Sequence, residues 1–295
     1  MTERLAGEFM VVCPDLRGYG ESPKSGSDFS KRTMGADVLA LMHQLGYERF
    51  AVAGHDRGAL VGQRLALEHP EAVSHLAVLD NVPVLDMWES IGADAAVGAY
   101  HLFFLAQPSD LPERLLAGSP EAFVDSFLDG WTTVGGAISD EARAAYHRTF
   151  SCPEDIRAVC EDYRAGATVD LEHDRADGEA GRRIAAPLLV LWQEPGGAAP
   201  PFDPLAIWRG WADDVTGRGL DCGHFLPEER PDEVAAALRE LLARPAADAP
   251  EAQTPANPAR SRQVSSGASS GAKWPAPGTI PCSTWATPAA RKPAT

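Results

Sequence analysis

Short apolar runs alternate with amphipathic stretches along this chain. Four of the runs have the length and composition of buried strands: residues 9–14, 50–54, 75–80 and 187–192. Apolar residues recur at helical spacing in other stretches, over residues 31–45, 58–68 and 232–243. Ser30 is placed to cap the first of these helices and Gly46 to end it, and the stretch up to Cys222 leaves room for a fifth strand. Strands that alternate with helices predict βαβ units and therefore a parallel sheet.

The stretch 83–185 breaks this alternation. It holds several helical patterns and no clear strand pattern: residues 87–104, 120–128, 140–150 and 153–165. A helical cap over the edge of a sheet is a common way to enclose a site. We therefore expect a core in residues 1–82 and 186–244 and a cap in residues 83–185. Residues 245–295 are rich in Pro, Ala and Ser without apolar periodicity, which predicts a disordered tail.

The charge balance of the chain bears on which classes of partner it can bind. Of its 295 residues, 42 are acidic and 26 are basic. The predicted tail holds five of the basic and two of the acidic residues, which leaves 21 basic against 40 acidic residues in 1–244. Such a surface repels phosphate backbones, which argues against nucleic acid as the main partner.

The cysteines and the N-terminus bear on the compartment. The five cysteines are an odd number and form no C-x-x-C pair, which argues against a disulfide framework and a zinc site. We expect no metal or cofactor. The N-terminus lacks the pattern of a signal peptide, and no apolar run approaches the length of a membrane span. We therefore expect a cytoplasmic protein that acts on a small-molecule substrate without membrane contact, and a homodimer is left open.

The central chemical motif is Gly54-His55-Asp56-Arg57-Gly58, between a predicted strand and a predicted helix. A nucleophile flanked by small residues at such a junction is typical of a nucleophile elbow, a tight and strained turn. A carboxylate at its centre suits attack on an sp³ carbon that bears a leaving group, with an ester as the intermediate. The alternative is that Asp56 only caps the helix.

An aspartyl ester needs a histidine to activate water and a second carboxylate to orient that histidine. His224 follows the last strand-like stretch, where ligands bind in open α/β folds. Asp80 ends a predicted strand and is the first candidate for the orienting acid. Its rivals are Glu194 and Asp203, in the loop after the strand at 187–192.

Several segments also carry a family resemblance: PDLRGYGES (14–22), AGHDRGA (53–59), AVLDNVP (77–83), YHLFFLAQP (100–108), CEDYRAG (160–166) and GHFLPEE (223–229). From Phe9 to Ala243 the chain resembles the haloacetate (fluoroacetate) dehalogenase subfamily of the α/β-hydrolase fold. The elbow alone would also fit haloalkane dehalogenases and epoxide hydrolases, but those usually place Trp after the nucleophile, where this chain has Arg57.

The resemblance implies an α/β fold with a mostly parallel sheet, helices on both faces and a helical cap insertion. It implies hydrolysis of a carbon–halogen bond, with Asp56 as the nucleophile, His224 as the base and Asp80 as the orienting acid. Arg57 would hold the carboxylate of the substrate. His101 and Tyr163, on the cap, would donate hydrogen bonds to the departing halide. For Arg64 and Arg164 we expect structural ion pairs, outside the site.

The chain departs from the family pattern at three places. Leu60 stands where the family has a second Arg, and Leu102 where a Trp follows the cap histidine. Both changes favour a larger, less charged substrate, so an epoxide hydrolase or another α/β hydrolase is an alternative function. The family also has an early strand and a His-Gly-x-Pro loop, which supplies an oxyanion donor, before VVCPDLRGYG. We therefore expect an N-terminally truncated fold, with an inactive product as the third alternative.

Overall fold

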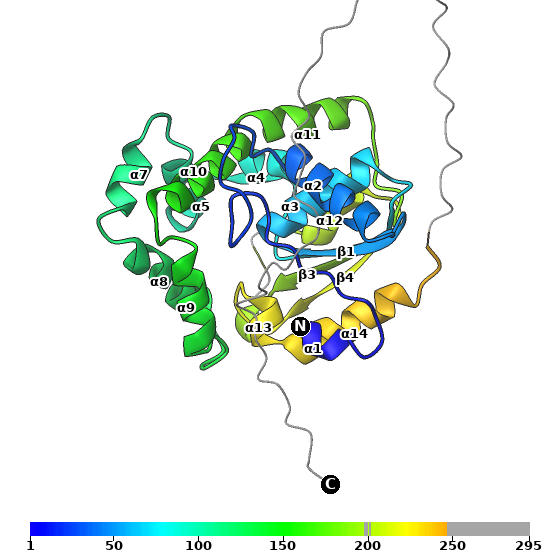
Figure 1. Ribbon diagram of the computed structural model, residues 1–295. Helices are drawn as coiled ribbons and strands as arrows, with labels where there is room; N and C mark the ends of the chain where they lie inside the picture. Colours follow the sequence, from blue (N-terminus) through cyan, green and yellow to red (C-terminus); the bar gives the residue numbers. More distant parts are fainter. Residues whose placement is uncertain (198–199, 201, 247–295) are drawn as a thin grey trace, which may run out of the picture. The chain divides into compact units, whose positions relative to one another are not determined.

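A parallel sheet lies at the centre of the computed structural model, which describes residues 1–197, 200 and 202–246 (Figure 1). In this part of the chain the sheet has four strands in the order β1-β2-β3-β4: β1 (Phe50–His55), β2 (Val73–Leu79), β3 (Leu188–Gln193) and β4 (Val215–Leu220). The register pairs His55 with Leu79, Leu79 with Leu191 and Gln193 with Leu220. The carboxyl ends of all four strands therefore meet at one edge.

Helices cover both faces of the sheet. On one face lie α2 (Lys31–Gln44), α3 (Arg57–Glu68) and α12 (Pro204–Trp211), and on the other α1 (Thr2–Leu5) and α14 (Pro231–Leu242) (Figure 1). Alternate residues of β3 pack against the helices on opposite faces of the sheet. Leu188 and Val190 pack with α3 and α12, and Leu189 and Leu191 pack with α14. A strand buried on both faces is apolar throughout, which is why it could be recognised from the sequence.

The helix boundaries follow local signals. The Ser30 side chain accepts a hydrogen bond from the N–H of Thr33 and caps α2 as expected. Gly46 follows the helix with φ +87°, a conformation that few other residues adopt. The fifth strand anticipated before Cys222 is β4, and the short helix α13 (Leu226–Glu229) precedes α14.

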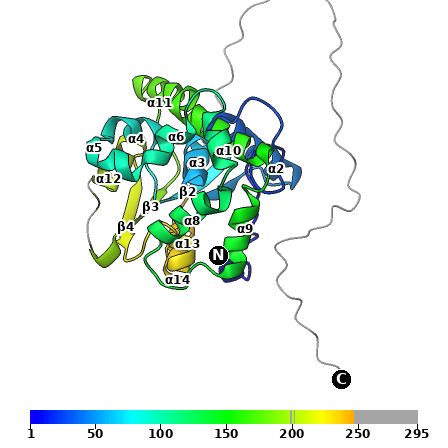
Figure 2. The same cartoon turned by 90° about the vertical axis from the view of Figure 1, so that its left-hand side faces the viewer.

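Between β2 and β3 the chain forms helices, which face the viewer in Figure 2. They are α4 (Val84–Ser90), α5 (Ala93–Gly98), α6 (Tyr100–Leu105), α7 (Leu111–Leu116), α8 (Pro120–Trp131), α9 (Asp140–Arg148), α10 (Pro153–Ala167) and α11 (Val169–Glu179). The single helical pattern at 87–104 is divided among α4, α5 and α6, with Gly92 between the first two. The division of the chain into core and cap domains stays a prediction.

The expected strand at 9–14 is not formed. This segment has no regular secondary structure, and its backbone makes no hydrogen-bond ladder with β1. Val11 packs against the sheet layer that holds α14, whereas Met10 is 74% exposed. Pro14 cannot donate to a ladder. Apolar composition alone does not make a strand, because a strand also needs a neighbour for its backbone groups.

Of the predicted tail, residues 245–295, all but residues 245 and 246 lie outside the described residues. Among the described helices, none is long and apolar enough to cross a bilayer.

Candidate active site

Three of the predicted site residues follow strand ends at the carboxyl edge of the sheet. Asp56 comes directly after β1, Asp80 directly after β2, and His224 lies in the loop after β4. Parallel strands bring their carboxyl ends to the same edge, so residues far apart in the sequence lie near one another there.

Asp56 sits in a strained strand-to-helix turn. Its backbone has φ +48° and ψ −116°, and its side chain makes no capping hydrogen bond to α3. A Cβ on Gly54 would clash with the carbonyl oxygen of Gly58, so the tight turn requires glycine at position 54. The Asn81 amide donates to the Asp56 carbonyl at 2.7 Å and to its Oδ1 at 3.3 Å. The geometry is that of a nucleophile elbow rather than of a simple helix cap.

Asp80 is the carboxylate that contacts His224. The Nδ1–H of His224 donates to Asp80 Oδ2 at 2.7 Å, which leaves Nε2 as the basic nitrogen. Gln193, at the end of β3, donates its backbone N–H to Oδ1 at 2.9 Å and its amide to Oδ2 at 2.8 Å. The two rival acids are used elsewhere: Glu194 accepts from the Trp192 indole, and Asp203 caps α12.

The charges of Asp56 and His224 each shift the pKa of the other residue. Burial by itself lowers the pKa of His224, but the hydrogen bond with Asp80 and the charge of Asp56 outweigh it, so the pKa is raised. Burial by itself raises the pKa of Asp56, and the charges of His224 and Arg57 bring it below its ordinary value. Asp56 is therefore ionised at neutral pH, which is the state that nucleophilic attack would require.

The backbone of His224 is held by two residues that the sequence analysis missed. Its N–H donates to the carbonyl of Trp131, at the end of α8, at 2.9 Å. Its carbonyl accepts from Nε2–H of His55 at 2.7 Å. Burial lowers the pKa of His55 to about 4, so this ring is a neutral donor at pH 7. The Trp131 and His224 rings lie 5.0 Å apart between centroids.

The two cap residues expected to meet the leaving group lie side by side. The rings of His101, on α6, and Tyr163, on α10, are 5.8 Å apart, and His101 is 5.1 Å from Trp131. Burial lowers the pKa of His101 to about 4, and its Nδ1 is buried without a hydrogen-bond partner among the described residues. The charge of Asp56 acts on the pKa of both His101 and Tyr163. Helices α6 and α10 therefore bring polar ring atoms toward Asp56.

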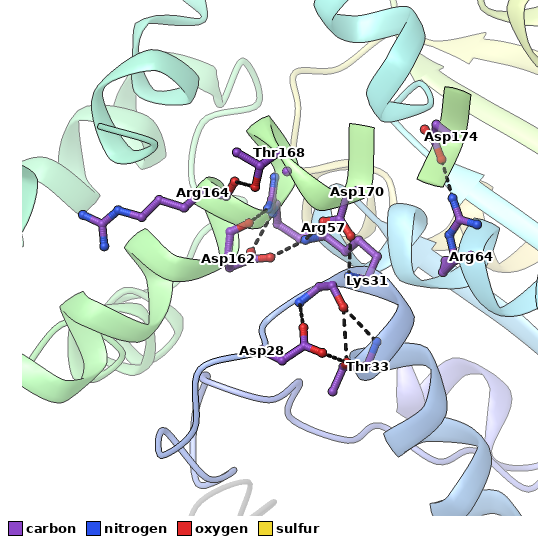
Figure 3. A network of polar contacts seen from close by, with 12 residues as sticks. Asp28, Lys31, Thr33, Arg57, Arg64, Asp162, Arg164, Thr168, Asp170 and Asp174 are labelled. Atoms are coloured by element: carbon purple, nitrogen blue, oxygen red, sulfur yellow. Dashed lines mark hydrogen bonds and ion pairs between the residues drawn. The ribbon is translucent and has the colours of Figure 1, made fainter. Parts of the chain in front are cut away.

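Arg57 belongs to a buried charge cluster between helices α2 and α3 on one side and α10 and α11 on the other (Figure 3). Its Nε–H donates to Asp162 Oδ2 at 2.8 Å and its Nη2 to the Asp162 carbonyl at 2.9 Å. The guanidinium also lies over the Tyr163 ring, 4.2 Å from its centroid. Lys31 pairs with the other oxygen of Asp162 and lies 3.5 Å from Asp170. Two cations thus face two carboxylates.

The other two arginines make structural ion pairs, as predicted. Arg64 is buried between Asp174 and Asp177 of α11. Arg164 pairs with Glu113 of α7 at 2.7 Å and with Glu161 at 2.9 Å. Neither guanidinium is among the main causes of the pKa shifts of Asp56 and His224.

Comparison with known proteins places this geometry in a family. Residues 2–231 match the family model for the alpha/beta hydrolase fold. The chain is an α/β hydrolase. The parallel sheet, the helices on both of its faces and the elbow at Asp56 are consistent with this membership.

Relatives of this α/β hydrolase act on different electrophiles. It is 38% identical to a fluoroacetate dehalogenase from Burkholderia sp., over 81% of this chain and 80% of that protein. It is 33% identical to a soluble epoxide hydrolase from Corynebacterium sp. strain C12, over 77% and 78% of the two chains. A Pseudomonas aeruginosa candidate epoxide hydrolase, a mutant solved with bound MFA, superposes with a TM-score of 0.79 and 48% identity over 82% of each chain.

Proposed function

We propose that this hydrolase cleaves a carbon–halogen bond through an aspartyl ester. The observation that carries the proposal is the set formed by Asp56 at the elbow and the Asp80–His224 pair at the same sheet edge. An Asp56 oxygen attacks the carbon, and the halide leaves with the bonding electrons. His224 Nε2 then takes a proton from water, and the hydroxide attacks the carboxyl carbon of the ester. The products are an alcohol, the halide and a proton, and the Asp56 carboxylate is restored.

The cap supplies the groups for the leaving halide in this scheme. His101 is neutral and Tyr163 keeps its phenolic proton, because burial raises the pKa of that phenol. Both can donate a hydrogen bond as negative charge develops on the halogen. Arg57, beside the nucleophile, would hold the carboxylate of a haloacetate.

Halide release tests this function. Fluoroacetate and chloroacetate should release halide with the intact chain and not with Asp56→Ala. His224→Asn should form the ester without hydrolysing it, which mass spectrometry would detect as added mass on the peptide that carries Asp56. Equal halide release by the Asp56→Ala variant would refute the proposal.

One observation favours a second candidate, the hydrolysis of a neutral electrophile such as an epoxide. The charge of Arg57 is offset by Asp162, and Leu60, one turn beyond Asp56, adds no second cation. A carboxylate substrate would therefore meet an anionic nucleophile without a surplus of positive charge. Tyr163 would supply the proton donor for the ring oxygen. Diol formation from an epoxide panel, without halide release from haloacids, would favour this candidate.

The proposal also covers the cellular compartment and the kind of partner that the enzyme binds. We place the enzyme in the cytoplasm with a small molecule as its partner, neither nucleic acid nor membrane. The cysteines among the described residues, Cys13, Cys152, Cys160 and Cys222, are free thiols, as is usual in a reducing compartment. A homodimer is left open, and size-exclusion chromatography with light scattering would decide it.

A further inference from the structure

Glu229, at the end of α13, is a buried carboxylate that the reaction scheme does not use. It is 4% exposed. Burial by itself raises its pKa, but hydrogen bonds from the backbone N–H groups of Gly223, Thr133 and Val134 lower it below its ordinary value. A buried carboxylate that remains ionised needs several donors, and these donors come from two separate loops.

One set of donors flanks His224. The N–H of Gly223 donates to Glu229 Oε2 at 3.0 Å, and the N–H of Phe225 donates to Oε1 at 3.1 Å. The residues directly before and after the histidine are therefore bound to the same side chain. Charge-assisted hydrogen bonds of this kind are stronger than neutral ones, so they restrain the histidine loop on both sides.

The other set comes from the loop that leaves α8 on the cap. Oε2 of Glu229 accepts from the N–H of Thr133 at 2.8 Å, from its hydroxyl at 3.1 Å and from the N–H of Val134 at 2.9 Å. This loop begins just after Trp131, whose carbonyl accepts the His224 N–H. A Cβ on Gly223 would clash with that same carbonyl oxygen. The Glu229 carboxylate is thus hydrogen-bonded to both the histidine loop and the loop after α8, which lie in close contact at Gly223.

We propose that Glu229 is a positioning residue. It holds the loop of His224 against the loop that follows α8, and it thereby keeps the His224 ring on Asp80. This inference rests on the aspartyl-ester function proposed above. In that mechanism the His224 ring must keep Nδ1 on Asp80 while Nε2 activates water. Formation of the ester by Asp56 does not use the histidine, whereas its hydrolysis does. Loss of Glu229 should therefore slow the second step and spare the first.

Glu229→Gln tests the proposal, because it keeps the shape of the side chain and removes its charge. With chloroacetate, the first turnover should still release about one halide per enzyme, whereas steady-state release should fall by up to about 100-fold, the cost of misplacing a catalytic group by about 1 Å. The ester should accumulate on the peptide that carries Asp56. The pH midpoint of turnover should also move down, because the charge of Glu229 raises the pKa of His224.

Glu228→Gln is the matched control. Glu228 is the neighbouring residue on α13, and its carboxylate accepts a hydrogen bond from the Tyr146 hydroxyl instead of binding the histidine loop. This variant should turn over without accumulating ester. Glu229→Asp keeps the charge on a shorter side chain, and it should accumulate the ester to a lesser degree. If Glu229→Gln does not fold, Glu229→Asp takes its place, and it is assayed at a temperature below the melting temperature of the aspartate variant.

His224→Asn separates failure of the inference from failure of the proposed function. If the His224 variant traps the ester and the Glu229 variants lose both steps equally, or neither step, Glu229 has no positioning role. If the His224 variant releases no first-turnover halide and traps no ester, the ester mechanism fails, and the inference fails with it.

Discussion

Replacing Asp162 by asparagine perturbs the buried charge cluster with little change of shape. The Asp162 carboxylate accepts hydrogen bonds from Arg57 Nε at 2.8 Å, from the Tyr19 hydroxyl at 2.7 Å and from the Lys31 ammonium. An amide cannot accept from all three groups. The variant leaves the two cations with Asp170 as the remaining carboxylate of the cluster.

The magnitude follows from burial. The side chain of Asp162 is 0% exposed and that of Lys31 is 2% exposed, so water cannot replace the lost partner. Removing one member of a buried ion pair costs about 3–5 kcal/mol of unfolding free energy. For a chain of this size, each kcal/mol shifts the melting temperature by about 2–4 °C, so a fall of roughly 6–20 °C is expected.

Thermal unfolding monitored by circular dichroism would measure this fall. Burial by itself raises the pKa of Asp162, but Arg57 and Lys31 hold it well below its usual range. The charge therefore stabilises the fold at pH values above the pKa of an unfolded aspartate, about 3.9. This stabilisation is lost as the pH falls toward the native pKa, so the difference between variant and wild type should shrink below about pH 4.

A surface pair provides the control. Asp213 is 82% exposed and pairs with Arg183. Asp213→Asn should cost less than about 1 kcal/mol. If Asp162→Asn melts no lower than Asp213→Asn at pH 7, the buried cluster does not stabilise the packing of α2 and α3 against α10 and α11, and the reasoning is wrong.

Three other outcomes are expected. In the free enzyme, the His224 ring should titrate with a midpoint above 6.5, because its hydrogen bond with Asp80 and the charge of Asp56 outweigh the effect of burial on its pKa; a lower midpoint in an NMR titration of the ring would contradict this. Gly54→Ala should lower stability by about 1–3 kcal/mol in denaturant unfolding, because its Cβ would meet the Gly58 carbonyl, and an unchanged midpoint would contradict the elbow geometry. Ser30→Ala should remove the cap of α2 and cost about 1 kcal/mol in the same assay, whereas Ser90→Ala, at the exposed end of α4, should cost less.

The local patterns were sufficient for the framework of the site. Continuous apolar runs revealed three of the four described strands, and the ends of two of them pointed to Asp56 and Asp80, whereas His224 follows β4, which has no such run. This succeeds because parallel strands place their carboxyl ends at one edge, so the order of elements along the chain is enough. The glycines around Asp56 indicated a tight turn, because such a turn leaves no room for a Cβ at Gly54.

Other features depended on partners that lie far away in the chain. Residues 9–14 have the composition of a strand but no ladder, because pairing is decided by neighbours. Helix α11 was missed because the side chains it buries are aspartates, which match Arg64 and Lys31 rather than an apolar core. Asp162 and Lys31 are 131 residues apart, and Thr133 and Glu229 are 96 apart.

From the sequence alone, the aspartates of α11, Asp162 and Glu229 would each be expected on a solvated surface. Only the tertiary structure supplies the cations and backbone donors that make burial of a carboxylate favourable. The groups proposed to react could therefore be located from the order and spacing of residues along the chain. The groups that hold them in place could not, because their charges are balanced by residues that only folding brings near.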